Sequence, residues 1–321
     1  MRSAFAATAP LAVLLTLGVG PQQPVFRSGL DLVTIGATVL DRRGGFVTDL
    51  EVEDFEVYED GRKQVLRFFA PCEAQQQDES ETRPALHLGV LLDISGSMEE
   101  DLRLARTAAI RFLNTLVDAV DITLVDFDTE VRMALYPQSD FARLVERVRS
   151  RKAEGYTALY DAIGVYLDGA RLQQGRKVLV IYTDGGDNSS NITLSETLSL
   201  LKASDVTVYS IGFLEHQPGG TLRDQRMQLQ QIAEVTGGQF LLPTSIKDLE
   251  AAYEKVSREI AAQYTLGYVS SNERADGSWR KIEIKVKRPD PKDVRIRARK
   301  GYFGPYKPSG QAPGRENPPA S

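Results

Sequence analysis

Strands and helices alternate through the middle of the chain, as the spacing of its hydrophobic residues indicates. Continuous apolar stretches predict strands buried on both faces at residues 86–92, 122–127, 178–182 and 206–213. Amphipathic stretches predict helices at residues 102–117, 141–148, 158–172, 194–201, 227–235 and 246–262. After a turn at Asp128, residues 131–135 predict a short antiparallel edge strand. Together these elements predict an α/β domain over residues 85–262, a doubly wound and mainly parallel sheet with helices on both faces.

Shorter strands flank this domain on both sides. Residues 32–39 are rich in β-branched side chains, and residues 54–58 alternate before the turn Glu59-Asp60-Gly61 leads into a strand at 65–69. On the C-terminal side of the α/β domain, strands are predicted at 264–269, 281–286 and 294–298. Too few strands lie at either end to form a stable sheet alone. We therefore expect an N-terminal β region, 25–70, to pack with a C-terminal β region, 263–304, in a small β-sandwich.

The remaining segments predict export, a linker and a tail. Met1-Arg2, the apolar residues 4–19 and the small Gly20 resemble a signal peptide over residues 1–22, with an imperfect cleavage site. We expect a periplasmic, cell-surface or secreted protein, with an uncleaved N-terminal anchor as the alternative. No other stretch approaches the ~20 apolar residues of a membrane-spanning helix. Residues 71–84 are polar and predict a linker, and the Pro- and Gly-rich residues 305–321 predict a disordered tail.

Charge and cysteine content narrow the function classes. The 321 residues carry a formal net charge of −5 with a pI near 5.4, which argues against a nucleic-acid-binding protein, because such proteins usually present a basic face. Several Lys and Arg occur in residues 285–300, where a solvated strand surface is the favoured interpretation. Cys72 is the only cysteine, so no intrachain disulfide can form, and its place in the polar linker suggests no role.

Five oxygen-bearing side chains are expected at one edge of the parallel sheet. Asp93 follows the first long strand of the α/β domain, Asp184 follows the third, and Thr157 lies in the loop before the third helix. Ligands of doubly wound sheets bind beyond the carboxyl ends of the strands. Ser95 and Ser97 follow Asp93 at intervals of two, so an extended loop would point all three side chains the same way.

Two carboxylates and three hydroxyls form a ligand set for a hard divalent cation. Mg²⁺, or in its place Mn²⁺ or Ca²⁺, takes oxygen ligands of this kind. No His or Cys lies near enough in sequence to indicate zinc or copper. The three hydroxyls are neutral, so if the two acids act partly through water, a bound cation would keep positive charge and an open position. That favours binding of a partner's carboxylate over catalysis.

These residues resemble the metal-ion-dependent adhesion site of von Willebrand factor type A (VWA) domains, whose motif is D-x-S-x-S with a separate Thr and Asp. All five positions match, as Asp93, Ser95, Ser97, Thr157 and Asp184. The resemblance covers the whole α/β domain. It implies a metal-dependent adhesion or scaffold protein whose Mg²⁺ coordinates an acidic residue of a protein partner.

Two weaker resemblances extend this comparison. Residues 52–61, 263–268 and 298–302 resemble a group of exported bacterial VWA-related proteins, which supports the architecture and export. In integrin-like relatives, acids just after the serines bind a second ion. Glu100 and Asp101 hold comparable positions here, and acids favoured at a solvated helix N-terminus explain them equally well.

Other interpretations remain open at this stage. Asp and Ser favour helix N-caps, although one cap needs only one such residue. A metal-dependent hydrolase would use the same open position, but only His87, inside a predicted strand, and His216, in a loop, offer an imidazole base. A structural envelope module with a vestigial site is the third alternative. We expect no enzyme activity, and we expect Asp187 and Asn188 to be polar loop residues at the rim.

Overall fold

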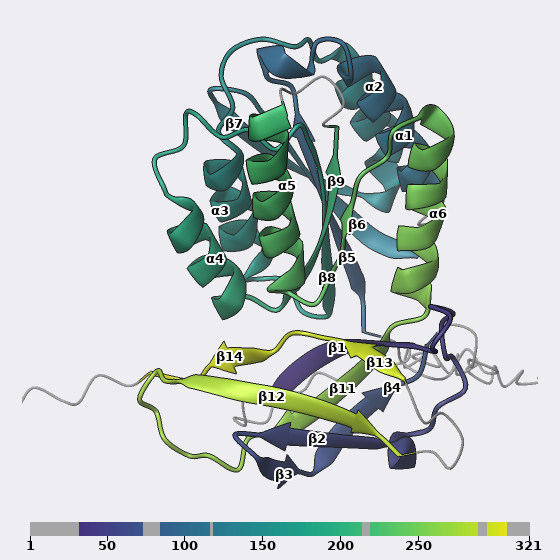
Figure 1. Cartoon of the computed structure of the whole chain (residues 1–321), viewed down its shortest axis with the longest axis vertical. Coiled ribbons are helices and arrows are strands. Elements are labelled where there is room, and N and C mark those ends of the chain that lie inside the picture. The colour runs from purple at the N-terminus through teal and green to yellow at the C-terminus, as the bar shows by residue number, and fades with distance from the viewer. Residues whose placement is uncertain (1–31, 73–83, 116–117, 214–218, 288–293, 307–321) are drawn as a thin grey trace, which may run out of the picture. The chain divides into compact units, whose positions relative to one another are not determined.

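The computed structural model describes residues 32–72, 84–115, 118–213, 219–287 and 294–306. The predicted signal peptide, most of the predicted linker, nearly all of the predicted tail and His216 lie outside these residues. Within them the chain forms one six-stranded sheet and two four-stranded sheets (Figure 1).

The six-stranded sheet has the order β10-β9-β8-β5-β6-β7. Its strands are β5 (Leu86–Asp93), β6 (Ala119–Phe127), β7 (Val131–Pro137), β8 (Arg176–Thr183), β9 (Val206–Gly212) and β10 (Phe240–Leu241). All neighbouring pairs are parallel except β6 and β7. The predicted mainly parallel sheet with an antiparallel edge strand is therefore confirmed. The two-residue β10 was not predicted, because so short a strand leaves no hydrophobic pattern.

Helices cover both faces of this sheet (Figure 1). One face carries α1 (Leu102–Thr115), α2 (Phe141–Ser150) and α6 (Ile246–Ala261), and the other carries α3 (Leu159–Ala170), α4 (Leu194–Ala203) and α5 (Gly219–Glu234). All eight residues of the central strand β5 are buried, which explains why its sequence is largely apolar. Gly89 in β5 lets α3 approach closely, since a Cβ there would lie 2.2 Å from the ring of Tyr166.

Strands from both sides of the α/β domain form the two four-stranded sheets, in the orders β13-β1-β11-β4 and β14-β12-β2-β3. The early strands are β1 (Leu32–Leu40), β2 (Phe55–Glu59), β3 (Arg62–Gln64) and β4 (Leu66–Ala70). The late strands are β11 (Tyr264–Val269), β12 (Trp279–Val286), β13 (Arg295–Arg297) and β14 (Gly301–Phe303). Because β1 pairs with β11 and β2 with β12, the expected joint sandwich is confirmed.

Two expectations for the N-terminal region are wrong. The turn at residues 59–61 was expected to lead into the strand at 65–69, but it leads into β3. The predicted strand is present as β4, and between the two the chain changes sheets at Val65, which is 65% exposed. β3 before it pairs with β2, whereas β4 after it pairs with β11 in the other sheet. Cys72 is not incidental either, because it is fully buried in the sandwich core and its thiol donates to the carbonyl of Thr48 at 3.2 Å.

A buried ion pair joins β2 and β12, neighbouring strands of one sheet, and Tyr268 on β11 of the other sheet hydrogen-bonds to it. The side chains of Glu59 and Arg280 are each 1% exposed, with Arg280 Nη1 3.6 Å from Glu59 Oε1. The hydroxyls of Tyr268, Ser270 and Tyr302 donate to the Glu59 carboxylate at 2.8, 2.6 and 2.8 Å. Arg280 also donates to the Ser270 hydroxyl at 2.8 Å. This network satisfies a charged pair that would otherwise be strongly unfavourable in the core.

We expect Glu59→Gln to lower the free energy of unfolding by about 3 kcal/mol, because removing one partner leaves a buried uncompensated charge. Urea denaturation followed by fluorescence is a direct measurement, since Trp279 is the only tryptophan and neighbours Arg280 in β12. Glu130→Gln, whose carboxylate is 77% exposed, is the matched control and should change little.

The same experiment includes Arg280→Met alone and combined with Glu59→Gln. The double variant should lose less stability than the sum of the losses of the two single variants, because each single substitution leaves the other charge buried without a partner. Strictly additive losses would contradict the coupling that we assign to this pair.

Candidate metal-binding site

The parallel pairing of β5 with β8 places two carboxylates at one edge of the sheet. Leu92 aligns with Tyr182 in this pair, so Asp93 at the end of β5 and Asp184 just after β8 emerge together. Both side chains are buried, at 0% and 2% exposure. Two acids thus lie close together in a place with little water.

Burial, followed by the charge of Asp184, raises the pKa of Asp93 to about 7. Hydrogen bonds oppose this shift: the Ser95 amide donates to Asp93 Oδ1 at 2.9 Å, and the Thr183 hydroxyl donates to Oδ2 at 2.6 Å. Among the described residues, no Lys or Arg forms an ion pair with Asp93. A buried pair of acids in this state fits a divalent cation, which would neutralise both.

Ser95 and Ser97 come together in a helical turn, so the expected extended loop is wrong. Residues Gly96–Met98 form a single 3₁₀ turn, and Ser95 directly before it has extended backbone. The turn carries the side chain of Met98 into the core, at 0% exposure. It nevertheless brings Ser95 Oγ and Ser97 Oγ within 3.1 Å of each other. The Ser95 side chain makes no capping hydrogen bond, and α1 begins only at Leu102, which disfavours the helix-cap alternative.

Backbone hydrogen bonds between loops bring Thr157 to the same edge. The Gly96 amide donates to the carbonyl of Gly155 at 3.1 Å, and the Thr157 amide donates to Asn188 Oδ1 at 2.8 Å. Thr157 is 3% exposed. The three loops that carry the five predicted ligands therefore adjoin, and cation binding by those ligands stays a prediction.

Thr183 is a site residue that the sequence reasoning missed. Its hydroxyl donates to Asp93 and accepts a hydrogen bond from the Gly185 amide at 3.0 Å, so it links the two acidic loops. It is fully buried at the end of β8. The available signal was a hydroxyl residue that ends an otherwise apolar buried strand directly before an acid.

Glu100 and Asp101 were the candidate ligands for a second ion. Within the described ranges, no three His, Cys, Asp or Glu side chains are grouped as metal ligands, so Glu100 and Asp101 join no such acidic cluster. The candidate site differs from a cluster of that kind because it has only two acids. His87 lies near the start of β5, at the opposite end of the strand from Asp93, and its ring nitrogens face Asp121 at 3.0 Å and the Gln174 carbonyl at 2.9 Å.

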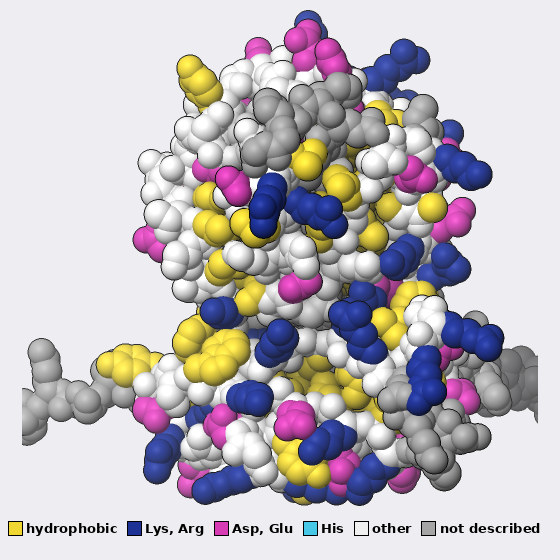
Figure 2. All heavy atoms as spheres, viewed as in Figure 1, with side chains coloured by type: hydrophobic (Ala, Val, Ile, Leu, Met, Phe, Trp, Pro, Cys, Tyr) yellow, Lys and Arg dark blue, Asp and Glu magenta, His cyan; other side chains and the backbone are white. Residues whose placement is uncertain are grey.

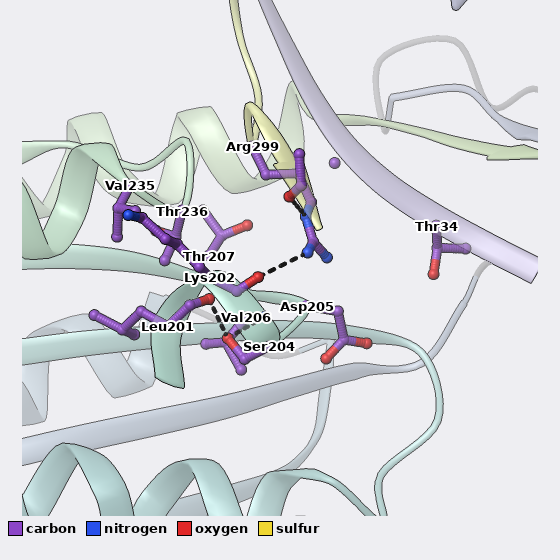
Figure 3. Close-up of a pocket in the computed structure, with 12 residues that line it drawn as sticks. Thr34, Leu201, Lys202, Ser204, Asp205, Val206, Thr207, Val235, Thr236 and Arg299 are labelled. Carbon is purple, nitrogen blue, oxygen red and sulfur yellow. Dashed lines mark hydrogen bonds between the residues drawn. The ribbon is translucent and has the colours of Figure 1, made fainter. Parts of the chain in front are cut away.

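A separate polar pocket lies near the start of β9, away from this edge. It is lined by residues of β1, α4, β9 and the segment before β14. Figure 3 shows the Arg299 guanidinium pointing toward the end of α4, where it donates to the Lys202 carbonyl at 3.2 Å. Arg299 thus binds a carbonyl that the end of a helix leaves unsatisfied. We assign this contact a structural role.

Basic residues of the C-terminal strands have acidic neighbours. Lys285 lies 3.3 Å from Glu283, and Lys287 lies 2.5 Å from Glu56. Figure 2 shows Lys and Arg side chains interspersed with Asp and Glu over this sandwich face. The arrangement fits the solvated strand surface that was favoured for residues 285–300.

Comparison with known proteins identifies the α/β domain. The family model described as von Willebrand factor type A domain matches residues 87–255. No curated protein matches the chain. Similar solved structures include the PilB minor pilin from Streptococcus sanguinis, with 12% identity, a TM-score of 0.47, and coverage of 58% of this chain and 64% of that chain. The chain therefore spans less than two thirds of the length of that pilin.

Two further structures have similar scores. One is the vWF domain of the type V pili tip protein Mfa5 from Porphyromonas gingivalis, at 13% identity and TM-score 0.47, covering 61% of this chain and 99% of that chain. The other is a von Willebrand factor type A protein from Catenulispora acidiphila, at 12% identity and TM-score 0.46, covering 88% and 76%.

The raised pKa of Asp93 predicts how the metal-free protein responds to pH. The folded pKa of about 7 lies above the ordinary value of 3.8, so between these values the folded state binds more protons than the unfolded state. Stability in EDTA should therefore fall as pH rises through this window. Asp93→Asn should remove that dependence and, at pH 8, raise the free energy of unfolding by roughly 2–4 kcal/mol.

Urea denaturation in EDTA at pH 5 and pH 8 measures this effect. The stabilisation by Asp93→Asn should be clearly smaller at pH 5, where wild-type Asp93 is already mostly protonated. Asp168→Asn, at a side chain that is 80% exposed, should behave like wild type at both pH values. An equal effect of Asp93→Asn at both pH values would contradict the assigned cause.

Proposed function

Because the chain belongs to the von Willebrand factor type A domain family, we propose that it is an exported protein that uses a divalent cation to bind an acidic side chain of a partner protein. Asp93, Ser95, Ser97, Thr157 and Asp184 would hold the cation, with Mg²⁺ favoured over Mn²⁺ or Ca²⁺. The role is adhesion or scaffolding, and the chain is not an enzyme.

The buried carboxylates of Asp93 and Asp184 carry this proposal. Burial, followed by the charge of Asp184, disfavours the charged form of Asp93, and a divalent cation would remove this penalty. The neighbouring hydroxyls of Ser95 and Ser97 are hard oxygen donors of the type that Mg²⁺ takes. Ser97 is exposed whereas Asp93 and Ser95 are buried, so the predicted ligands extend from the interior to the surface. A partner side chain can therefore reach the site from the Ser97 side.

The balance of charge favours recognition of an acid. The predicted ligands include two carboxylates and three neutral hydroxyls, and if the acids act partly through water the bound cation keeps net positive charge. Such a cation, when bound, would supply a coordination position for an external carboxylate. Catalysis would also need a positioned proton acceptor such as histidine. His87, the only histidine among the described residues, lies at the other end of β5 and is engaged with Asp121.

Export completes the proposal and is inferred from sequence. Its support is the apolar stretch at residues 4–19 behind Arg2, which resembles a signal peptide. In the part of the chain that the structure describes, no helix is both long enough and apolar enough to cross a membrane.

Isothermal titration calorimetry with MgCl₂ tests the site. Wild-type protein should bind one Mg²⁺ per chain, and Asp93→Ala and Asp184→Ala should each abolish binding while the fold, monitored by circular dichroism, survives. Asp168→Ala is the matched control, because that carboxylate is 80% exposed and distant in sequence from the predicted ligands. Unchanged affinity for Mg²⁺ in both Asp93→Ala and Asp184→Ala would contradict the proposed site.

Partner capture tests the function. Wild-type protein immobilised in Mg²⁺ should retain envelope proteins that EDTA releases, and Asp184→Ala should retain none of them. A captured partner should lose binding when its contacting Asp or Glu is changed to Asn or Gln. Retention that is insensitive to both EDTA and Asp184→Ala would show that binding does not use the cation.

A further inference from the structure

Asn188 joins the loop that carries Asp184 to the loop that carries Thr157. Its side-chain Oδ1 accepts a hydrogen bond from the Thr157 amide at 2.8 Å. In return, the backbone amides of Asn188 and Ser189 donate to the Thr157 carbonyl at 3.0 and 3.1 Å. Both backbone polar groups of Thr157 are therefore bound by one short segment, which lies four and five residues beyond Asp184.

The Thr157 loop depends on such contacts because it has no regular structure of its own. The Tyr156 amide donates to the Thr129 hydroxyl at 2.8 Å, and the Ala158 amide donates to the Asp128 carbonyl at 2.9 Å. Consecutive amides from 156 to 158 thus bind three different partners, drawn from two other loops. Of these, only Asn188 lies on the loop that also carries an acidic ligand of the proposed site.

The Asn188 segment is itself held on its far side. The Asp161 carboxylate, in the first turn of α3, accepts hydrogen bonds from the amides of Asn191 and Ile192 at 3.0 and 3.2 Å. Asp187 Oδ2 accepts from the Tyr160 amide at 3.0 Å. Because β8 fixes one end of the loop and α3 fixes the other, Asn188 is a rigid spacer between Asp184 and Thr157.

We propose that Asn188 is a positioning residue that sets the separation of the Thr157 hydroxyl from the Asp184 carboxylate and thereby favours Mg²⁺ over Ca²⁺. This inference rests on the proposed function, since it concerns the same site. Mg²⁺ needs near-octahedral ligands at about 2.0–2.1 Å, whereas Ca²⁺ accepts about 2.3–2.6 Å and variable geometry. Loosening one ligand therefore weakens Mg²⁺ binding far more than Ca²⁺ binding.

Because Asn188 is exposed, its side chain can be substituted without disturbing the hydrophobic core. Asn188→Ala removes the acceptor for the Thr157 amide, and Asn188→Asp keeps an oxygen at the same position. Asn191→Ala is the matched control, because it removes one side-chain hydrogen bond, from Nδ2 to Asp161 at 2.8 Å, in the same loop but away from Thr157.

Calorimetric titration of the full chain with MgCl₂ and, separately, with CaCl₂ tests the inference. Asn188→Ala should raise the Kd for Mg²⁺ about tenfold, the range expected for a residue that orients a metal ligand, and should change the Kd for Ca²⁺ much less. Asn188→Asp should restore Mg²⁺ affinity, and Asn191→Ala should match wild type. A parallel loss for both ions, or no loss for either, would overturn the role assigned to Asn188.

A metal-free measurement separates this inference from the proposed function. In EDTA, Asn188→Ala should speed hydrogen exchange of the Thr157 amide, while amides in β5 and β8 keep their wild-type protection. Unchanged exchange at Thr157 would overturn the positioning role. If the wild-type protein binds neither ion, the proposed function is wrong. If the wild-type protein binds Mg²⁺ and Asn188→Ala binds it equally well, only the inference about Asn188 is wrong.

Discussion

The central constraint in this protein is the parallel pairing of β5 with β8, which delivers two buried carboxylates to the same edge of a sheet. The strands are apolar along their length, so they exclude water from the place where Asp93 and Asp184 emerge. Burial, followed by repulsion from Asp184, raises the pKa of Asp93 to about 7. This pairing fixes the edge at which the neighbouring hydroxyls and the proposed cation site lie. The hydrogen bonds between Asn188 and Thr157 then hold a third loop at the same edge.

The stability of the site and of the sandwich come from different sources. At the edge that holds Asp93, the loops are stabilised by hydrogen bonds between their backbone groups and neighbouring loops, and they rest on the hydrophobic core of the α/β domain. The sandwich is held by its own apolar core, by pairing of early with late strands, and by the Glu59–Arg280 network. Pairing of early with late strands brings residues far apart in sequence, such as Tyr268 and Glu59, into direct contact.

Much of this arrangement could be predicted from sequence, because burial on both faces of a strand and amphipathic helices leave strong local patterns. The ends of β5 and β8 then gave the places of Asp93 and Asp184. Features set by distant contacts could not be predicted. The sheet change at Val65 has no local signal, and the 3₁₀ turn after Ser95 follows from burial of Met98. Asn188 looked like an ordinary loop residue because its role depends on Thr157, 31 residues away.

The most direct test of the central claim is anomalous diffraction from crystals of the full chain grown with MnCl₂. Mn²⁺ shares the oxygen preference of Mg²⁺ and scatters anomalously, so its position can be located without reference to any expected site. The account predicts one strong peak at the carboxyl ends of β5 and β8, contacted by side chains of the five predicted ligands and lost in Asp93→Asn crystals. A peak at another place, or none at that edge in the presence of excess Mn²⁺, would contradict it.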